Sequence, residues 1–287
     1  MSIKTILVPI NGTESSRSAL DTAFMVGQDL AAHVDVLHVV PEPKDAIPLL
    51  GEGMSAAIIE DMIQLAEAEA SERTGRAEAM FEEARNSHGL AISQKASPGK
   101  AGSTALVRCV GREDELTAAK GRLADLIVAS RPTEESEATV AMTINAALFE
   151  TGRPVLVAPP RTSQKIGKKI AVLWNGSAEA SRAVAAAMPL ITRCDKVIIM
   201  TAENDKTSSA VAPELATYFA WHGVRAETRT LPGRSQVGEV LLEDCTVVGV
   251  DMLVMGAYTH SRMRQLILGG VTKHVLANAQ LPTLMAH

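Results

Sequence analysis

KTILVPINGTESSRSAL (residues 4–20) and KKIAVLWNGSAEASRAV (residues 168–184) are two copies of one pattern. Each copy has a short apolar run, then Asn-Gly followed by Thr or Ser, then a segment rich in alanine and serine. Asn11-Gly12 aligns with Asn175-Gly176. A buried strand that turns at Asn-Gly and continues into a helix explains both copies.

The rest of the chain repeats in the same order. The further landmarks are ADLIVAS (124–130) with VDMLVMG (250–256), RPVLVAP (153–159) with LPTLMAH (281–287), and Pro98-Gly99-Lys100 with Pro232-Gly233-Arg234. Landmarks that recur in order indicate two copies of one structural unit. We therefore expect a first domain at residues 1–160 and a second at 166–287, with a polar, proline-rich linker between them.

Short apolar runs alternate with helical patterns in the first half. The runs are 6–8, 34–40, 91–92, 126–128 and 155–157. A long alanine- and glutamate-rich stretch, 54–85, places Ile58, Met62 and Leu65 at helical spacing. This alternation predicts βαβ units with a parallel sheet buried on both faces. Ligands of such sheets bind at the carboxyl ends of the strands, where Asn175 and Gly256 are expected.

Composition excludes several classes of function. The 287 residues carry a net charge of -5 and only 3% aromatics, so a nucleic-acid surface is not expected. No apolar stretch approaches the roughly 18 residues of a membrane span. The N-terminus has no signal-peptide layout, and Cys109, Cys194 and Cys245 form no CxxC pair, so no disulfide framework or metal site is expected. We expect a cytoplasmic protein.

Two glycine clusters enclose a basic loop near the end of the chain. Gly256 follows an apolar run, Arg262 and Arg264 lie in the loop, and Gly269-Gly270-Val271-Thr272 reads as the start of a helix. Free amides at a helix N-terminus bind anions, so this pattern is typical of a phosphate site. The alternative is structural: Gly256 permits a tight turn, and Gly269-Gly270 permits close helix packing. Asn175 likewise is either a turn residue or a contact to a base or ribose.

These landmarks resemble the universal stress protein family, and two copies resemble its tandem form. The resemblance implies an adenine nucleotide alpha hydrolase-like fold, with an open parallel five-stranded sheet flanked by helices in each half. Nucleotide-binding members hold ATP phosphates with Gly, two residues, Gly, nine residues, then Gly-Ser/Thr. An Asp after the first strand lies on the adenine side.

Carried onto this chain, the resemblance places ATP or another adenine nucleotide in the second half. The implied binding residues are Asn175, Gly256, Thr259, Gly269, Gly270, Val271 and Thr272. Thr259 stands at the second glycine position and adds a Cβ to the loop, and Gly270 lacks the usual hydroxyl. Asn175 stands at the Asp position. Because of these departures, the alternative that the protein binds no cofactor stays open.

The first half departs further from the pattern. Ser130 replaces the first glycine, residues 131–135 replace the loop, and Val140–Thr143 stand where Gly269–Thr272 stand in the second half. Pro132 removes an amide, and the glutamates of the loop would repel phosphate. We therefore expect no phosphate loop in this half.

Three functions remain open. The first is a stress-response protein with one adenine-nucleotide site in the second domain, and the second is a universal stress protein that acts through protein contacts alone. The third, an ATP-hydrolysing enzyme, would need a signature such as SGGxDS, which INGTES (10–15) and WNGSAE (174–179) do not supply. We expect no catalytic residues.

The expected partners follow from the same resemblance. The two domains should form an intramolecular pseudo-dimer through Val155–Val157 and Thr283–Met285, their last strands. Burying these strands avoids open sheet edges. A further homodimer stays open, and neither nucleic acid nor a membrane is expected.

Overall fold

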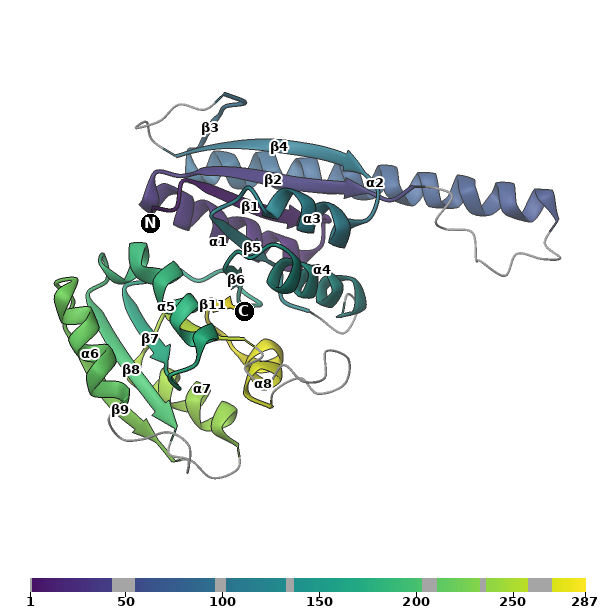
Figure 1. Cartoon of the computed structure of the whole chain (residues 1–287). Coiled ribbons are helices and arrows are strands. Elements are labelled where there is room, and N and C mark those ends of the chain that lie inside the picture. Colours follow the sequence, from purple (N-terminus) through teal and green to yellow (C-terminus); the bar gives the residue numbers. More distant parts are fainter. Residues whose placement is uncertain are drawn as a thin grey trace.

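The computed structural model describes residues 2–42, 55–95, 102–132, 137–202, 211–232, 236–257 and 270–287. They form one sheet of 11 strands in the order β3-β4-β2-β1-β5-β6-β11-β10-β7-β8-β9. Helices cover both faces of the sheet (Figure 1). One apolar layer packs under α1, α2, α5 and α6, and the other packs under α4, α7 and α8.

The elements alternate along the chain as βαβ units require. Those of the first half are β1 (Thr5–Ile10), α1 (Glu14–Leu30), β2 (His33–Val40), α2 (Ala56–His88), β3 (Ala91–Ile92), β4 (Ser103–Val110), α3 (Glu113–Gly121), β5 (Leu126–Ala129), α4 (Glu137–Glu150) and β6 (Val155–Val157). Those of the second half are β7 (Lys169–Leu173), α5 (Ala178–Ile191), β8 (Lys196–Ala202), α6 (Val211–Trp221), β9 (Ala226–Leu231), α7 (Val237–Val248), β10 (Met252–Gly256), α8 (Gly270–Asn278) and β11 (Thr283–Ala286).

Both halves share one strand order. It reads β4-β2-β1-β5-β6 in the first half and β9-β8-β7-β10-β11 in the second, and all pairs within a half are parallel. The predicted α/β class with parallel sheets and flanking helices is confirmed. In each half the order reverses beside the first strand, so the switch points lie between β1 and β5 and between β7 and β10.

The strand predicted at residues 91–92 is confirmed as β3, a two-residue strand at the edge of the sheet. The longer strand β4, which lies between β3 and β2, was not predicted. β4 reads STALVRCV, and most of its residues are partly or fully exposed. Its sequence therefore lacks the continuous apolar run by which buried parallel strands are recognised.

The two halves meet at their last strands, as predicted. β6 and β11 pair antiparallel, with Leu156 opposite Leu284, and both leucines are fully buried. This pairing joins two parallel five-stranded sheets, with β3 added at one edge, into one continuous sheet. Each half thereby covers the edge that the other would expose.

The internal repeat extends to side-chain contacts. The carboxylate of Asp125 accepts the backbone N–H of Thr5 at 3.0 Å, and Asp251 accepts that of Lys169 at 3.0 Å. Asp125 thus joins the amino end of β5 to the amino end of β1. Asp251 joins the amino end of β10 to the amino end of β7 in the same way. The division into domains at 1–160 and 166–287 stays a prediction.

The long helix α2 distinguishes the first half from the second. It has 33 residues, against 11 in α6, and projects past the body of the protein (Figure 1). The side chain of Ser55 caps its start by accepting the N–H of Ile58 at 3.3 Å. Its buried residues begin only at Ala70, and Leu65 remains 63% exposed. The predicted helix, 54–85, is thus confirmed with slightly shifted ends.

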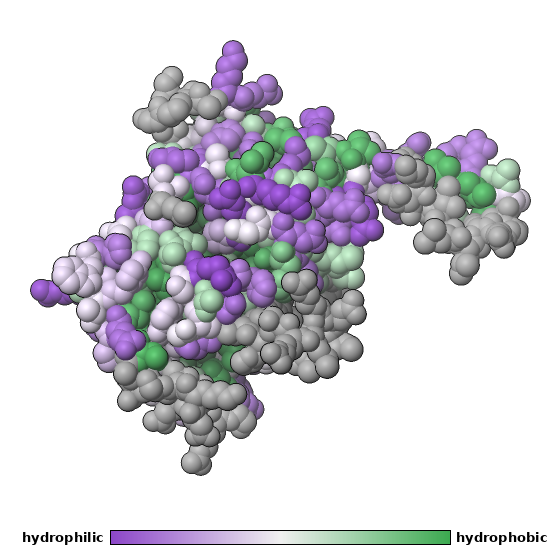
Figure 2. Space-filling view, viewed as in Figure 1, coloured by the Kyte–Doolittle hydropathy of each residue, from purple (hydrophilic) through white to green (hydrophobic). Residues whose placement is uncertain are grey.

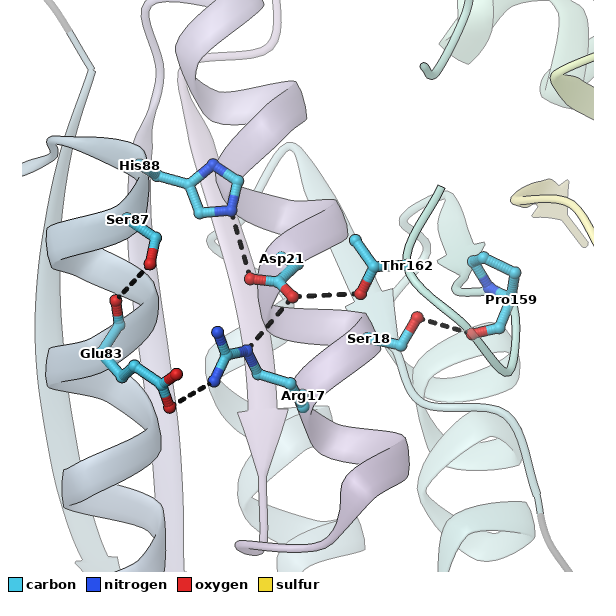
Figure 3. A network of polar contacts seen from close by, with 8 residues as sticks. All are labelled: Arg17, Ser18, Asp21, Glu83, Ser87, His88, Pro159 and Thr162. Atoms are coloured by element: carbon cyan, nitrogen blue, oxygen red, sulfur yellow. Dashed lines mark hydrogen bonds and ion pairs between the residues drawn. The ribbon is translucent and has the colours of Figure 1, made fainter. Parts of the chain in front are cut away.

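The segment after β6 is hydrogen-bonded to α1 of the first half (Figure 3). The hydroxyl of Ser18 on α1 donates to the carbonyl oxygen of Pro159 at 2.7 Å, and that of Thr162 donates to Asp21 at 3.0 Å. Asp21 also lies 3.2 Å from the ring of His88 on α2. These contacts hold the predicted linker against α1.

Candidate functional site

The carboxyl ends of β7 and β10 meet at the switch point of the second half. Leu173 of β7 lies opposite Met255 of β10, so the turn at Asn175 and the turn after Gly256 begin side by side. The structure therefore brings together two of the predicted site residues. Thr259 and Gly269 lie outside the described residues.

Gly256 packs against the first turn of α5. A Cβ on this glycine would lie 2.5 Å from the nitrogen of Ala180 and 2.8 Å from the carbonyl carbon of Glu179. Side chains essentially never approach backbone atoms this closely, so packing alone requires glycine here. The side chain of Ser177 caps the same turn by accepting the Ala180 N–H at 3.1 Å.

Asn175 shapes the turn that leads into α5. Its side-chain oxygen accepts the N–H of Ser177 at 3.1 Å, and the side chain is exposed. Asn11 does the same in the first half, where its oxygen accepts the N–H of Thr13 at 3.2 Å. The Oδ1 atom of Asn175 thus accepts a hydrogen bond within the turn, and its Nδ2 group is the part that could donate to a ligand.

Gly270 is the first described residue of α8 and is exposed, and nothing lies within 4 Å of the place where its Cβ would be. Val271 is half-buried, and Thr272 is buried. Residues 258–269, which precede this helix, lie outside the described residues.

The corresponding place in the first half is filled. A cavity of only about 10 Å³ remains there, between Asn11, Ser130 and Thr143. The carboxylate of Glu113, at the start of α3, also lines it and accepts the hydroxyl of Thr143 at 2.9 Å. Burial raises the pKa of Glu113 above its ordinary value of 4.5. A cavity of this volume has room for about one water molecule and none for a nucleotide.

Ala141 and Thr143 of α4 lie more than three residues after Glu137, so their amides are bonded along the helix. Gly270, which aligns with Ala141, is the first described residue of α8, and residues 258–269 before it lie outside the described residues.

Two roomier grooves lie away from both switch points. One of about 530 Å³ runs between α7 and α8 and is lined by Glu239, Glu243 and His274. The other, of about 550 Å³, lies between α2 and the ends of β2 and β4, beside Thr74 and Val110. Neither contains any of the predicted site residues.

Sequence reasoning missed Glu113 and the role of Arg131. Arg131 was noted only as a replacement within the lost loop, yet it is 3% exposed and reaches into the second half. An arginine two residues after a buried strand, where the other copy has Ala257, was a usable signal. Glu113 carried none, because acids in a first helical turn are common.

No group of three or more His, Cys, Asp or Glu side chains among the described residues is placed to hold a metal ion. Within the same ranges, no helix has the length and apolar character needed to cross a membrane.

Comparisons with known proteins show the family and the fold. The family model described as the universal stress protein family matches residues 2–158 and 201–287. A universal stress protein of Synechocystis is 23% identical over 297 residues, which cover 98% of this chain and 99% of the relative. The solved structure of a universal stress protein from Archaeoglobus fulgidus is similar in fold, with a TM-score of 0.68 at 14% identity over 98% of this chain and 97% of that one. A functionally unknown protein of Pseudomonas aeruginosa gives 0.57 at 14% identity, over 99% and 92%.

Proposed function

Because this chain belongs to the universal stress protein family, we propose that it is a stress-response protein that binds an adenine nucleotide weakly in its second half. The phosphates would lie against the amides of Gly270 and Val271 and the turn after Gly256. The adenine side would lie near Asn175. Thr259 and Gly269 would complete the loop, and Thr272 would belong to the same helical turn.

One observation carries this proposal: the two equivalent places differ in room. In the first half, Glu113 and a cavity of about 10 Å³ leave no space for a phosphate, and the carboxylate would repel one. In the second half, Gly270 is exposed, and a Cβ on it would meet nothing within 4 Å. The sequence predicts that a helix starts at Gly269-Gly270, and the first amides of a helix can bind an anion. A nucleotide is therefore expected only in the second half.

The binding is expected to be weak. Asn175 stands where an aspartate would supply a charge, and its oxygen already accepts the N–H of Ser177. A hydrogen bond to a charged group contributes roughly 1.5–3 kcal/mol, so its absence weakens binding by about tenfold to a hundredfold.

Calorimetric titration with ATP, AMP and adenosine tests the proposal. ATP should bind more tightly than adenosine, because only the phosphates meet the amides of α8. Gly269→Val should abolish this difference. If wild-type protein gives no binding heat at millimolar ATP, the nucleotide proposal is wrong.

A role through protein contacts is the second candidate, and α2 favours it. The projecting part of this helix exposes Ile58 (49%) and Leu65 (63%). Apolar patches appear along the projection among polar residues (Figure 2). Exposed apolar side chains on a projecting element are typical of interaction surfaces.

A further inference from the structure

Arg131 crosses from the first half to the second. It follows β5, and its side chain is 3% exposed. Its Nη1 donates to the carbonyl oxygens of Val275 and Leu276, each at 3.1 Å. Both carbonyls belong to the last turn of α8, whose first turn carries Gly270. Arg131 of the first half thus binds the carboxyl end of α8, and Gly270 of the proposed phosphate site lies at the other end of the described part of this helix.

A contribution to the stability of the fold does not explain why residue 131 is an arginine. Its Nε and Nη2 atoms are buried and have no hydrogen-bond partner among the described residues. Burial lowers the pKa of Arg131 to about 10, so the group is still charged at neutral pH. A buried charge with unpaired donors costs free energy, and an apolar side chain of similar volume is often as stable or more so.

The repeat shows that the fold does not require an arginine at this place. The alignment of β5 with β10 puts Ala257 at the position of Arg131. Ala257 is fully buried, and its N–H donates to the carbonyl oxygen of Ala286 at 2.8 Å. The pseudo-symmetry of the two halves is therefore broken at this position, where the first half has a buried cation and the second half has an alanine.

Arg131 contacts the carboxyl end of α8, whose described part is the nine residues Gly270–Asn278. A cation at its C-terminus meets the negative end of the helix dipole and fixes the last carbonyls. Because nine residues of α-helix form a rigid unit of roughly 13 Å, fixing the carboxyl end of α8 also fixes the position of Gly270.

We propose that Arg131 is a positioning residue through which the first half sets the placement of α8 and hence the phosphate affinity of the second half. This inference rests on the proposed nucleotide function for its binding consequence. The structural link to α8 stands apart from that function. By linkage, bound phosphate would in turn favour the arrangement in which Arg131 holds α8.

Three variants separate this role from a merely structural one. Arg131→Met removes the charge but keeps much of the volume, and Arg131→Lys keeps a charge with fewer donors. Arg153→Met is the matched control, because Arg153 also donates to a backbone carbonyl, that of Arg122 at 2.8 Å, but within the first half. Each variant is titrated with ATP and with adenosine, and its amide hydrogen exchange and thermal unfolding are measured.

Arg131→Met should weaken ATP binding about fivefold or more and leave adenosine binding unchanged. Arg131→Lys should fall between it and wild type, and Arg153→Met should match wild type. The amides of α8 should exchange faster in Arg131→Met without a lowered unfolding temperature. Equal losses for ATP and adenosine, or unchanged exchange in α8, would overturn the inference. If wild-type protein binds no nucleotide, the proposed function fails, whereas faster exchange confined to α8 still supports the link between the halves.

Discussion

Gly256 and Ala180 approach so closely that any side chain at position 256 would meet the backbone of α5. The Cβ of such a side chain would lie 2.5 Å from the Ala180 nitrogen. The end of β10 and the start of α5 are therefore fixed against each other at the switch point of the second half. This contact explains the glycine without any ligand, whereas Gly270 is exposed and a Cβ on it would meet nothing within 4 Å.

Gly256→Ala should lower the free energy of unfolding by about 1–3 kcal/mol, because the backbone of α5 must shift to admit the methyl group. Gly270→Ala is the matched control. Its Cβ would meet nothing within 4 Å, so it should leave stability unchanged or raise it by about 0.5–1 kcal/mol through helix propensity. Urea unfolding measures both. Equal stabilities of the two variants would contradict the packing explanation.

Leu156 and Leu284 should depend on each other energetically. They lie opposite each other across the antiparallel pair of β6 and β11 and are fully buried. Each change to alanine should cost about 2–5 kcal/mol. The double variant should lose less than the two losses added together, because the residues share one contact. Strict additivity in a double-mutant cycle would show that the two strands do not pack as described.

Glu113→Gln should stabilise the protein at neutral pH. Burial raises the pKa of Glu113 above 4.5 in the folded state, so the ionised form is disfavoured there. The wild type therefore loses stability relative to the variant as pH rises from about 4.5 through the folded pKa. Below that range the two should be equally stable.

Unfolding measured from pH 4 to pH 8 tests this prediction. Glu115→Gln on the same helix is the control, because the side chain of Glu115 is 70% exposed. It should change stability little at any pH. A Glu113→Gln variant less stable than wild type at pH 7 would mean that the carboxylate is stabilised rather than strained by its surroundings.

Restoring the missing features of the loop should tighten nucleotide binding. Thr259→Gly removes a Cβ where close backbone approach is expected, and Gly270→Ser adds a hydroxyl donor at the start of α8. The double variant should bind ATP more tightly than wild type, as measured by calorimetry. No binding at millimolar ATP even then would favour the protein-contact function.

The repeat was readable because both copies keep the same Asn-Gly turn and the same paired aspartates, Asp125 and Asp251. Strand β4 was not, since it begins with Ser103-Thr104 and the exposed Arg108 interrupts its apolar run. Glu113 and Arg131 act across contacts between elements distant in sequence. Charged residues after a strand or at a helix start look the same whether they face solvent or a neighbouring element, so only the folded arrangement reveals them.

The most direct test of the central claim places one negative charge at each of the two aligned helix positions. Gly270→Asp should abolish or strongly weaken ATP binding, although an acid at a helix N-terminus favours the helix itself. Ala141→Asp, the aligned change in α4, should leave ATP binding as in wild type. Calorimetric titration of both variants with ATP measures the two affinities. Loss of binding in Ala141→Asp with binding retained in Gly270→Asp would place the nucleotide in the first half and contradict the account.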